Sequence, residues 1–152
     1  MLFVFSFIFC QLASLIGMLF TNSSLNSWYS TLNKPSFNPP SYVFGPVWVF
    51  LFLLMAIAFY LVLIKGQKNK HYKTAVVIFV LQWILNVLWS FFFFFMQSPF
   101  MALLEIMTLW LLILLTMYHF YKIEKVAAWF LAPYVLWVTF ATILNFAIVV
   151  LN

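Results

Sequence analysis

The chain has 152 residues, of which 68% are apolar and only 6% are charged, and its formal net charge is +5. About a quarter of the residues of a soluble globular domain are charged. This composition therefore excludes a soluble globular domain and indicates a protein that lies mainly in lipid. The basic charge does not indicate a nucleic-acid partner, because the lysines lie in short groups between apolar runs. Cys10 is the single cysteine, so no intrachain disulfide is expected.

Five apolar runs follow one another along the chain, and each reaches the roughly 20 residues that a helix needs to cross the hydrocarbon core. They predict helices at about residues 1–20, 44–64, 74–96, 100–121 and 126–151. The fold class is therefore an all-α membrane protein, a five-transmembrane-helix bundle that forms a single domain over residues 1–152. The first run lacks a basic start and a small-residue cleavage site, so we interpret it as a helix and not as a signal peptide.

The connections between these predicted helices differ in length and charge. Residues 21–43 form a long loop between the first and second helices, whereas the connections at 65–73, 97–99 and 122–125 are short. If the chain alternates sides, every lysine except Lys34 falls on one side of the membrane. The positive-inside rule then places the amino terminus in the cytoplasm and the long loop outside.

Polar side chains inside the predicted helices recur at helical spacing. In the third helix, Gln82, Asn86 and Ser90 lie on one face, with Trp89 beside them. Similar stripes are formed by Tyr134, Trp137, Ala141 and Asn145 in the fifth helix and by Trp48, Phe52, Met55 and Phe59 in the second. Three such stripes predict a shared interior with a cavity in the outer half of the bundle, for which the long loop is a possible lid.

Two interpretations of the polar stripe remain open, because asparagine, glutamine and serine also join membrane helices by hydrogen bonds. Trp28 and Trp129 fit an interfacial belt or loop packing, but Trp137 lies far from either end of its helix. Glu105 is the only acidic residue within a predicted span. We expect it to be protonated or hydrogen-bonded, to Thr108 or to amides across the bundle, in a structural or pocket-edge role.

Catalytic and cofactor signatures are mostly absent: there is no phosphate-binding glycine loop, no paired carboxylate, no Cys/His cluster and no Ser-His-acid set. No metal site is predicted and no cofactor is required. His71 and His119 lie towards the cytoplasmic side, so neither is placed to ligate a haem iron in the outer cavity. A flat aromatic ligand there would be held by stacking and by hydrogen bonds at its edge.

Three stretches of the chain resemble, in the same order, the sequence motifs of a known protein family. They are WYSTLNKPSFNPPSYVFGPVWVFLFLLMAIAFYLV (Trp28–Val62), LQWILNVLWSFFFF (Leu81–Phe94) and AAWFLAPYVLWVTFATILN (Ala127–Asn145). In this order they closely resemble the TspO/MBR family, the tryptophan-rich sensory proteins and translocator proteins. The resemblance implies a five-helix bundle, usually a homodimer, in a prokaryotic cell membrane, with tetrapyrroles (porphyrin or haem), other hydrophobic small molecules and membrane lipid as partners.

The resemblance also implies site residues. The family's ligand-binding positions fall on Trp28, Tyr29, Pro39, Trp48, Phe52, Asn86, Trp89, Trp137 and Ala141. Some bacterial members are reported to degrade protoporphyrin IX in light, which makes Trp48 and Trp137 the candidate catalytic residues if that activity is present. The cholesterol-recognition pattern of animal members is missing, because no lysine or arginine follows Tyr134. Sterol binding is therefore not expected.

Three functions are compatible with these residues. The first is a tetrapyrrole-binding protein that acts as a sensor or transporter. The second is a light-dependent porphyrin-degrading enzyme that uses the pocket tryptophans. The third is a structural or lipid-organising membrane protein whose tryptophans only pack. Two small-residue pairs, Ala13 with Gly17 and Ala128 with Ala132, permit close helix approach, either in a dimer or within one bundle.

Overall fold

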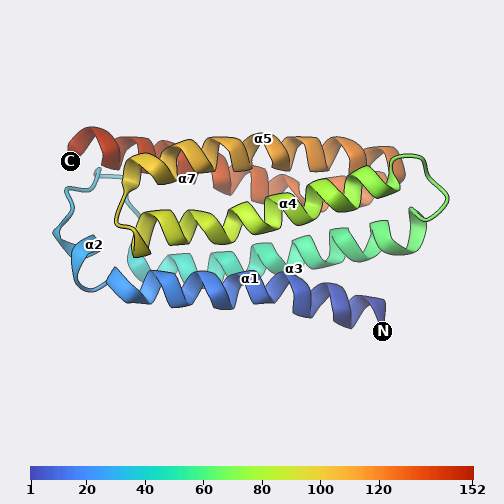
Figure 1. Ribbon diagram of the computed structural model, residues 1–152, viewed down its shortest axis with the longest axis horizontal. Coiled ribbons are helices and arrows are strands. Elements are labelled where there is room, and N and C mark those ends of the chain that lie inside the picture. Colours follow the sequence, from blue (N-terminus) through green and yellow to red (C-terminus); the bar gives the residue numbers. More distant parts are fainter.

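A computed structural model describes residues 1–152. The chain folds into helices and their connections, without strands. Five helical segments are long and apolar enough to span a membrane, and their axes run side by side along the molecule (Figure 1). Their bounds are Leu2–Ser24, Ser41–Lys65, Tyr72–Phe95, Pro99–Ile123 and Lys125–Leu151. The predicted all-α fold with five membrane-spanning helices is confirmed, and the chain is an integral multi-pass membrane protein.

The helices form a closed ring. Helix α1 (Leu2–Ser24) packs between α3 (Ser41–Lys65) and α4 (Tyr72–Ser90). Helix α5 (Pro99–Ile123) follows α4, and the last span, formed by α6 (Lys125–Phe130) and α7 (Ala132–Leu151), closes the ring by packing on α5 and α3. Residues of all the spans therefore face one interior, as the polar stripes predicted.

The two ends of the bundle differ in charge. One end holds the amino terminus, the connection 66–71 and the turn between α5 and α6 (Figure 1). We call it the basic end, because it carries Lys65, Lys68, Lys70, Lys73, Lys122 and Lys125. The other end carries α2 (Trp28–Thr31), the turn after residue 95 and the carboxyl terminus, and we call it the α2 end.

The connection between the first two spans is shorter than the predicted long loop of residues 21–43. Helix α1 continues to Ser24 and α3 begins at Ser41, so the connection covers residues 25–40 and includes the short helix α2. In the last turn of α1, the Thr21 hydroxyl donates to the carbonyl of Gly17 and the Ser24 hydroxyl donates across to the carbonyl of Phe94. Pro46 lies inside α3 rather than at its start, although proline is best tolerated in the first turn.

The third span ends in a π-helix. Residues Phe91–Phe95 continue α4 with wider turns, closed by a bond from the amide of Met96 to the carbonyl of Phe91. The wider turns carry Phe93 and Phe94 into the interior, while Phe95 stays exposed. Gln97 then takes a positive φ of 52° in the tight turn, and Pro99 opens α5.

The last span is broken rather than continuous over 126–151 as predicted. Helix α6 ends at Phe130 and α7 begins at Ala132, with Leu131 between them. Pro133 has no amide hydrogen, so it cannot donate to the carbonyl four residues earlier, and the helix breaks there.

Candidate functional site

A cavity of about 300 Å³ lies inside the bundle, in the half nearest the α2 end. Its walls come from α1, α3, α4 with the π-helix, and α7, and Tyr29 of α2 closes it towards the connection 25–40. Most of its lining is apolar, with a few amide and hydroxyl groups. Such a lining is typical of sites for hydrophobic small molecules.

Three tryptophans stand on three different walls of this cavity. Trp48 of α3 stacks on Phe52, with ring centroids 5.6 Å apart. Trp89 of α4 stacks on Phe93 at 5.1 Å, and its indole nitrogen donates to Asn145 Oδ1 at 3.1 Å. Trp137 of α7 also lines the cavity, and its buried indole nitrogen has no hydrogen-bond partner.

A chain of hydrogen-bonded polar side chains begins at Asn86 on the cavity wall and continues into the packed interior. Asn86 Nδ2 donates to the Tyr134 hydroxyl at 2.8 Å, and that hydroxyl donates to Gln82 Oε1 at 3.0 Å. All three side chains are buried, so each bond satisfies a group that would be costly to leave unpaired in lipid. Both interpretations of the polar stripe therefore hold in part: Gln82 joins helices, while Asn86 joins helices and also lines the cavity.

The connection over the cavity is held by hydrogen bonds at several points. The Tyr29 hydroxyl donates to Asn38 Oδ1 at 3.1 Å, and Lys34 Nζ lies 4.7 Å from the centre of the Tyr29 ring. Burial raises the pKa of Tyr29, and the bond to Asn38 opposes that rise. Asn33 and Asn152 bond reciprocally, each through a 2.9 Å contact, and tie the connection to the end of α7.

Most of the residues assigned from the sequence come together in this cavity. Those that line it are Tyr29, Trp48, Phe52, Asn86, Trp89, Trp137 and Ala141. Trp28 and Pro39 are not among its lining residues, and Trp28 packs instead against Phe93 with ring centroids 5.7 Å apart. The fold thus brings seven of the nine assigned residues together around one cavity. Their ligand-binding role stays a prediction.

Sequence reasoning missed the wall that α1 contributes. Ala13, Ser14, Gly17 and Thr21 all line the cavity. The signal was the small-residue pair Ala13 and Gly17, which was interpreted only as a site of close helix approach. The approach is real, because a Cβ on Gly17 would lie 3.4 Å from Ser90 Oγ, and the same small side chains leave room for the cavity.

Glu105 lies buried on α5 outside the lining of this cavity. Neither of its carboxyl oxygens has a hydrogen-bond partner. The expected bond to Thr108 is absent, because the Thr108 hydroxyl donates to the carbonyl of Leu104 on its own helix. A pocket-edge role for Glu105 is therefore not supported, and the residue stays a buried carboxyl in the bundle interior.

The fold and the cavity define a class: a five-span helical membrane protein with an internal, tryptophan-walled cavity under the connection of its first two spans. A model of the TspO/MBR family matches residues 6–151. The chain belongs to the TspO/MBR family, which confirms the resemblance found in its three sequence stretches.

Relatives of known name agree with this membership. The "Tryptophan-rich protein TspO" of Chlorobaculum tepidum is 44% identical over 143 residues, which are 94% of this chain and 90% of the relative. "Protein CrtK" of Rhodobacter capsulatus is 32% identical over 151 residues, 99% and 92% of the two chains. The human "Translocator protein" is 30% identical over 139 residues, 91% and 82% of the two chains.

Proposed function

We propose that this protein binds a tetrapyrrole, porphyrin or haem, or another flat hydrophobic molecule in the cavity, and that it acts as a sensor or transporter. The observation that carries the proposal is the convergence of Trp48, Trp89 and Trp137 on one cavity. Aromatic faces stack on flat ligands, and Asn86 and Tyr29 supply polar groups at the cavity wall. Translocator and sensory names among the relatives support the same class of function.

The ligand would be held without a histidine ligand to iron. No histidine lines the cavity, and both histidines of the chain lie at the basic end. In this proposal, stacking and edge hydrogen bonds provide the affinity. The cavity volume of about 300 Å³ is at the lower limit for small-molecule sites. A ligand as large as a tetrapyrrole would therefore fill the cavity completely and require its walls to widen.

The orientation of the bundle belongs to the same proposal. All lysines except Lys34 lie at the basic end, so the positive-inside rule places that end in the cytoplasm and the cavity in the outer half of the bilayer. The homodimer implied by the family also remains a proposal. Ala13 and Ala128 are buried within the single bundle, so neither small-residue pair is a free dimer surface as a whole.

The test is a titration of the detergent-solubilised protein with protoporphyrin IX in darkness, followed by tryptophan fluorescence. We expect saturable quenching that weakens in Trp137→Ala and persists in Trp129→Phe, because Trp129 is an exposed tryptophan outside the cavity. Absence of saturable quenching would refute the binding proposal and favour the structural or lipid-organising role.

A second candidate function is light-dependent degradation of a bound porphyrin, favoured by the placement of Trp48 and Trp137 on one cavity. The same sample under illumination tests it. Loss of the porphyrin absorption bands that is faster in the wild type than in a Trp48→Phe, Trp137→Phe double variant, with binding retained, would establish an enzyme. A stable spectrum would leave binding or sensing as the function.

A further inference from the structure

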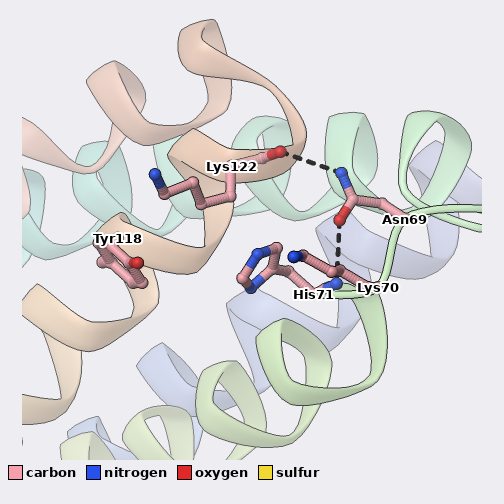
Figure 2. Close-up of a pocket in the computed structure, with 5 residues that line it drawn as sticks. All are labelled: Asn69, Lys70, His71, Tyr118 and Lys122. Carbon is pink, nitrogen blue, oxygen red and sulfur yellow. Dashed lines mark hydrogen bonds between the residues drawn. The ribbon is translucent and has the colours of Figure 1, made fainter.

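A second pocket lies at the basic end of the bundle, far from the tryptophan-walled cavity. It is open, and it is lined by Asn69, Lys70, His71, Tyr118 and Lys122 (Figure 2). None of these residues lines the cavity at the α2 end. The pocket is therefore a separate site, and a ligand bound there is independent of the proposed function.

Hydrogen bonds of Asn69 hold the two sides of this pocket together. Asn69 Nδ2 donates to the carbonyl oxygen of Lys122 at 2.9 Å, and Asn69 Oδ1 accepts from the amide of His71 at 2.9 Å (Figure 2). These bonds fix the connection 66–71 against the last turn of α5. Lys70 and His71 are thereby kept opposite Tyr118 and Lys122, whose ammonium group lies 5.3 Å from the centre of the Tyr118 ring.

The positive charge of this pocket has no carboxylate partner. The chain has two acidic residues, Glu105 and Glu124. Glu105 is buried in the bundle, and Glu124 is ion-paired with Lys65 and accepts from the amide of Val126. Lys70 and Lys122 thus face solvent as uncompensated cations, and such a concentration of one sign attracts anions.

The imidazole of His71 also lines the pocket, and it is paired with a second histidine. His71 Nδ1 lies 3.2 Å from His119 Nδ1, a hydrogen bond in which one ring donates and the other accepts. When His71 is the ring that accepts at Nδ1, its own proton is on Nε2 and that N–H is free to donate in the pocket; when His71 donates at Nδ1, its Nε2 is an acceptor. His71 is also the residue that precedes the first turn of α4, where the helix dipole favours negative charge.

We propose that this pocket binds a phosphate group, carried by the headgroup of a membrane lipid or by a soluble phosphorylated molecule. The lining holds the ammonium groups of Lys70 and Lys122, the Tyr118 hydroxyl and, in the tautomer with a proton on Nε2, the His71 imidazole. Several separate donors suit the several acceptor oxygens of a phosphate better than a planar carboxylate. The pocket lies at the ends of two membrane-spanning helices, α4 and α5, and Tyr118 is 53% exposed. Lipid phosphates lie at this level of a bilayer.

The two histidines make the test selective, because the chain has no others. Full-length protein labelled only at histidine, in a phosphate-free maltoside detergent, gives imidazole signals from this cluster alone. We expect saturable shifts of these signals on addition of inorganic phosphate, measured against sodium chloride of equal ionic strength. A matched pair of lipids, phosphatidic acid and diacylglycerol with the same acyl chains, then shows whether a headgroup gives the same shifts.

Matched double variants separate a site from general electrostatics. Lys70→Ala with Lys122→Ala removes two pocket lysines, whereas Lys68→Ala with Lys73→Ala removes two lysines at the same end that do not line it. We expect phosphate affinity to fall at least about tenfold in the first pair and to persist in the second. Lys70→Gln with Lys122→Gln gives the same comparison if the alanine pair does not fold.

The titrations with phosphatidic acid and diacylglycerol identify the source of the phosphate. Saturable shifts with phosphatidic acid and none with diacylglycerol assign the site to lipid headgroups, and shifts with inorganic phosphate alone assign it to a soluble ligand. The proposal is overturned if neither probe gives saturable shifts, or if the two double variants lose affinity equally.

Discussion

The two halves of the bundle are built by different means. Towards the α2 end, the helices surround a cavity and are joined by side-chain hydrogen bonds such as Trp89 to Asn145. Towards the basic end, the interior is filled by a stack of three phenylalanine rings. The ring centroid of Phe79 lies 4.2 Å from that of Phe59 and 5.6 Å from that of Phe120. A hollow and a solid region of one bundle therefore need different interactions between helices.

The physical reason lies in the solvent. Lipid is as apolar as a leucine side chain, so hydrophobic burial does not drive membrane helices together, and packing and hydrogen bonds do. A cavity removes packing contacts from its walls, and hydrogen bonds across the gap replace them. Asn145 shows this, because it accepts from Trp89 and also donates to the carbonyl of Pro99 at 2.8 Å, which joins three segments.

The largest expected effect of a single substitution is in the solid half. Phe79→Ala removes the central ring of the stack, which is fully buried, and should lower the free energy of unfolding by about 3 kcal/mol. The measurement is unfolding in mixed detergent micelles. Phe44→Ala, on the wall of the existing cavity, should cost only about 1 kcal/mol, because that side already lacks contacts. Equal losses would show that the two halves do not differ in packing.

The next effect is at the buried hydrogen bonds that connect the cavity residue Asn86 to Tyr134 and Gln82. Tyr134→Phe keeps the ring and removes the hydroxyl that accepts from Asn86 and donates to Gln82. We expect a loss of about 1.5 kcal/mol in the same unfolding assay, near the upper limit for hydrogen bonds in membranes. Tyr42→Phe is the matched control at a tyrosine that is 79% exposed, and a loss there as large as in Tyr134→Phe would contradict the prediction.

The apolar runs were sufficient to predict the five spans, because length and hydropathy determine whether a segment crosses lipid. The same reasoning placed the ends less well. It stopped α1 at residue 20, although Thr21 and Ser24 satisfy their hydroxyl groups on Gly17 and Phe94. It also missed the break at Leu131 and the π-helix of Phe91–Phe95, because hydropathy contains no information about which backbone amide bonds to which carbonyl.

The candidate site was predicted in part for a similar reason. Spacing on one helix identified the faces of α3, α4 and α7, since those stripes contain tryptophans and amides that stand out in an apolar run. The wall from α1 consists of small residues such as Ala13 and Gly17, which carry no chemical signal of their own. The pocket at the basic end joins His71 to Tyr118 and Lys122 across the fold, and only the tertiary structure brings them together.

A smaller effect tests whether the cavity wall depends on single bonds. Ser24 Oγ donates to the carbonyl of Phe94 at 2.7 Å, a buried bond between α1 and the π-helix. Ser24→Ala should cost about 0.6 kcal/mol, the average for such bonds in membranes. The control is Ser23→Ala, because Ser23 is exposed and bonds only within its own helix. Identical melting curves for the two variants would show that the bond does not hold the wall.

The smallest effect is expected at the basic end, where Lys65 and Glu124 form an exposed ion pair. Glu124→Gln keeps an oxygen for the amide of Val126 and removes the charge, and it should cost at most about 0.5 kcal/mol at neutral pH because solvent screens the pair. The hydrogen bond from Lys65 lowers the pKa of Glu124 from its ordinary 4.5.

A carboxyl group with a lowered pKa in the folded state stabilises the fold above its ordinary pKa, and that stabilisation is lost as the pH falls through the lowered value. The difference in unfolding free energy between wild type and Glu124→Gln should therefore persist from neutral pH down to 4.5 and disappear below it. Unfolding of both proteins along a pH series, at low and high salt, measures this. A difference that stays constant in acid would show that it does not arise from the charge of Glu124.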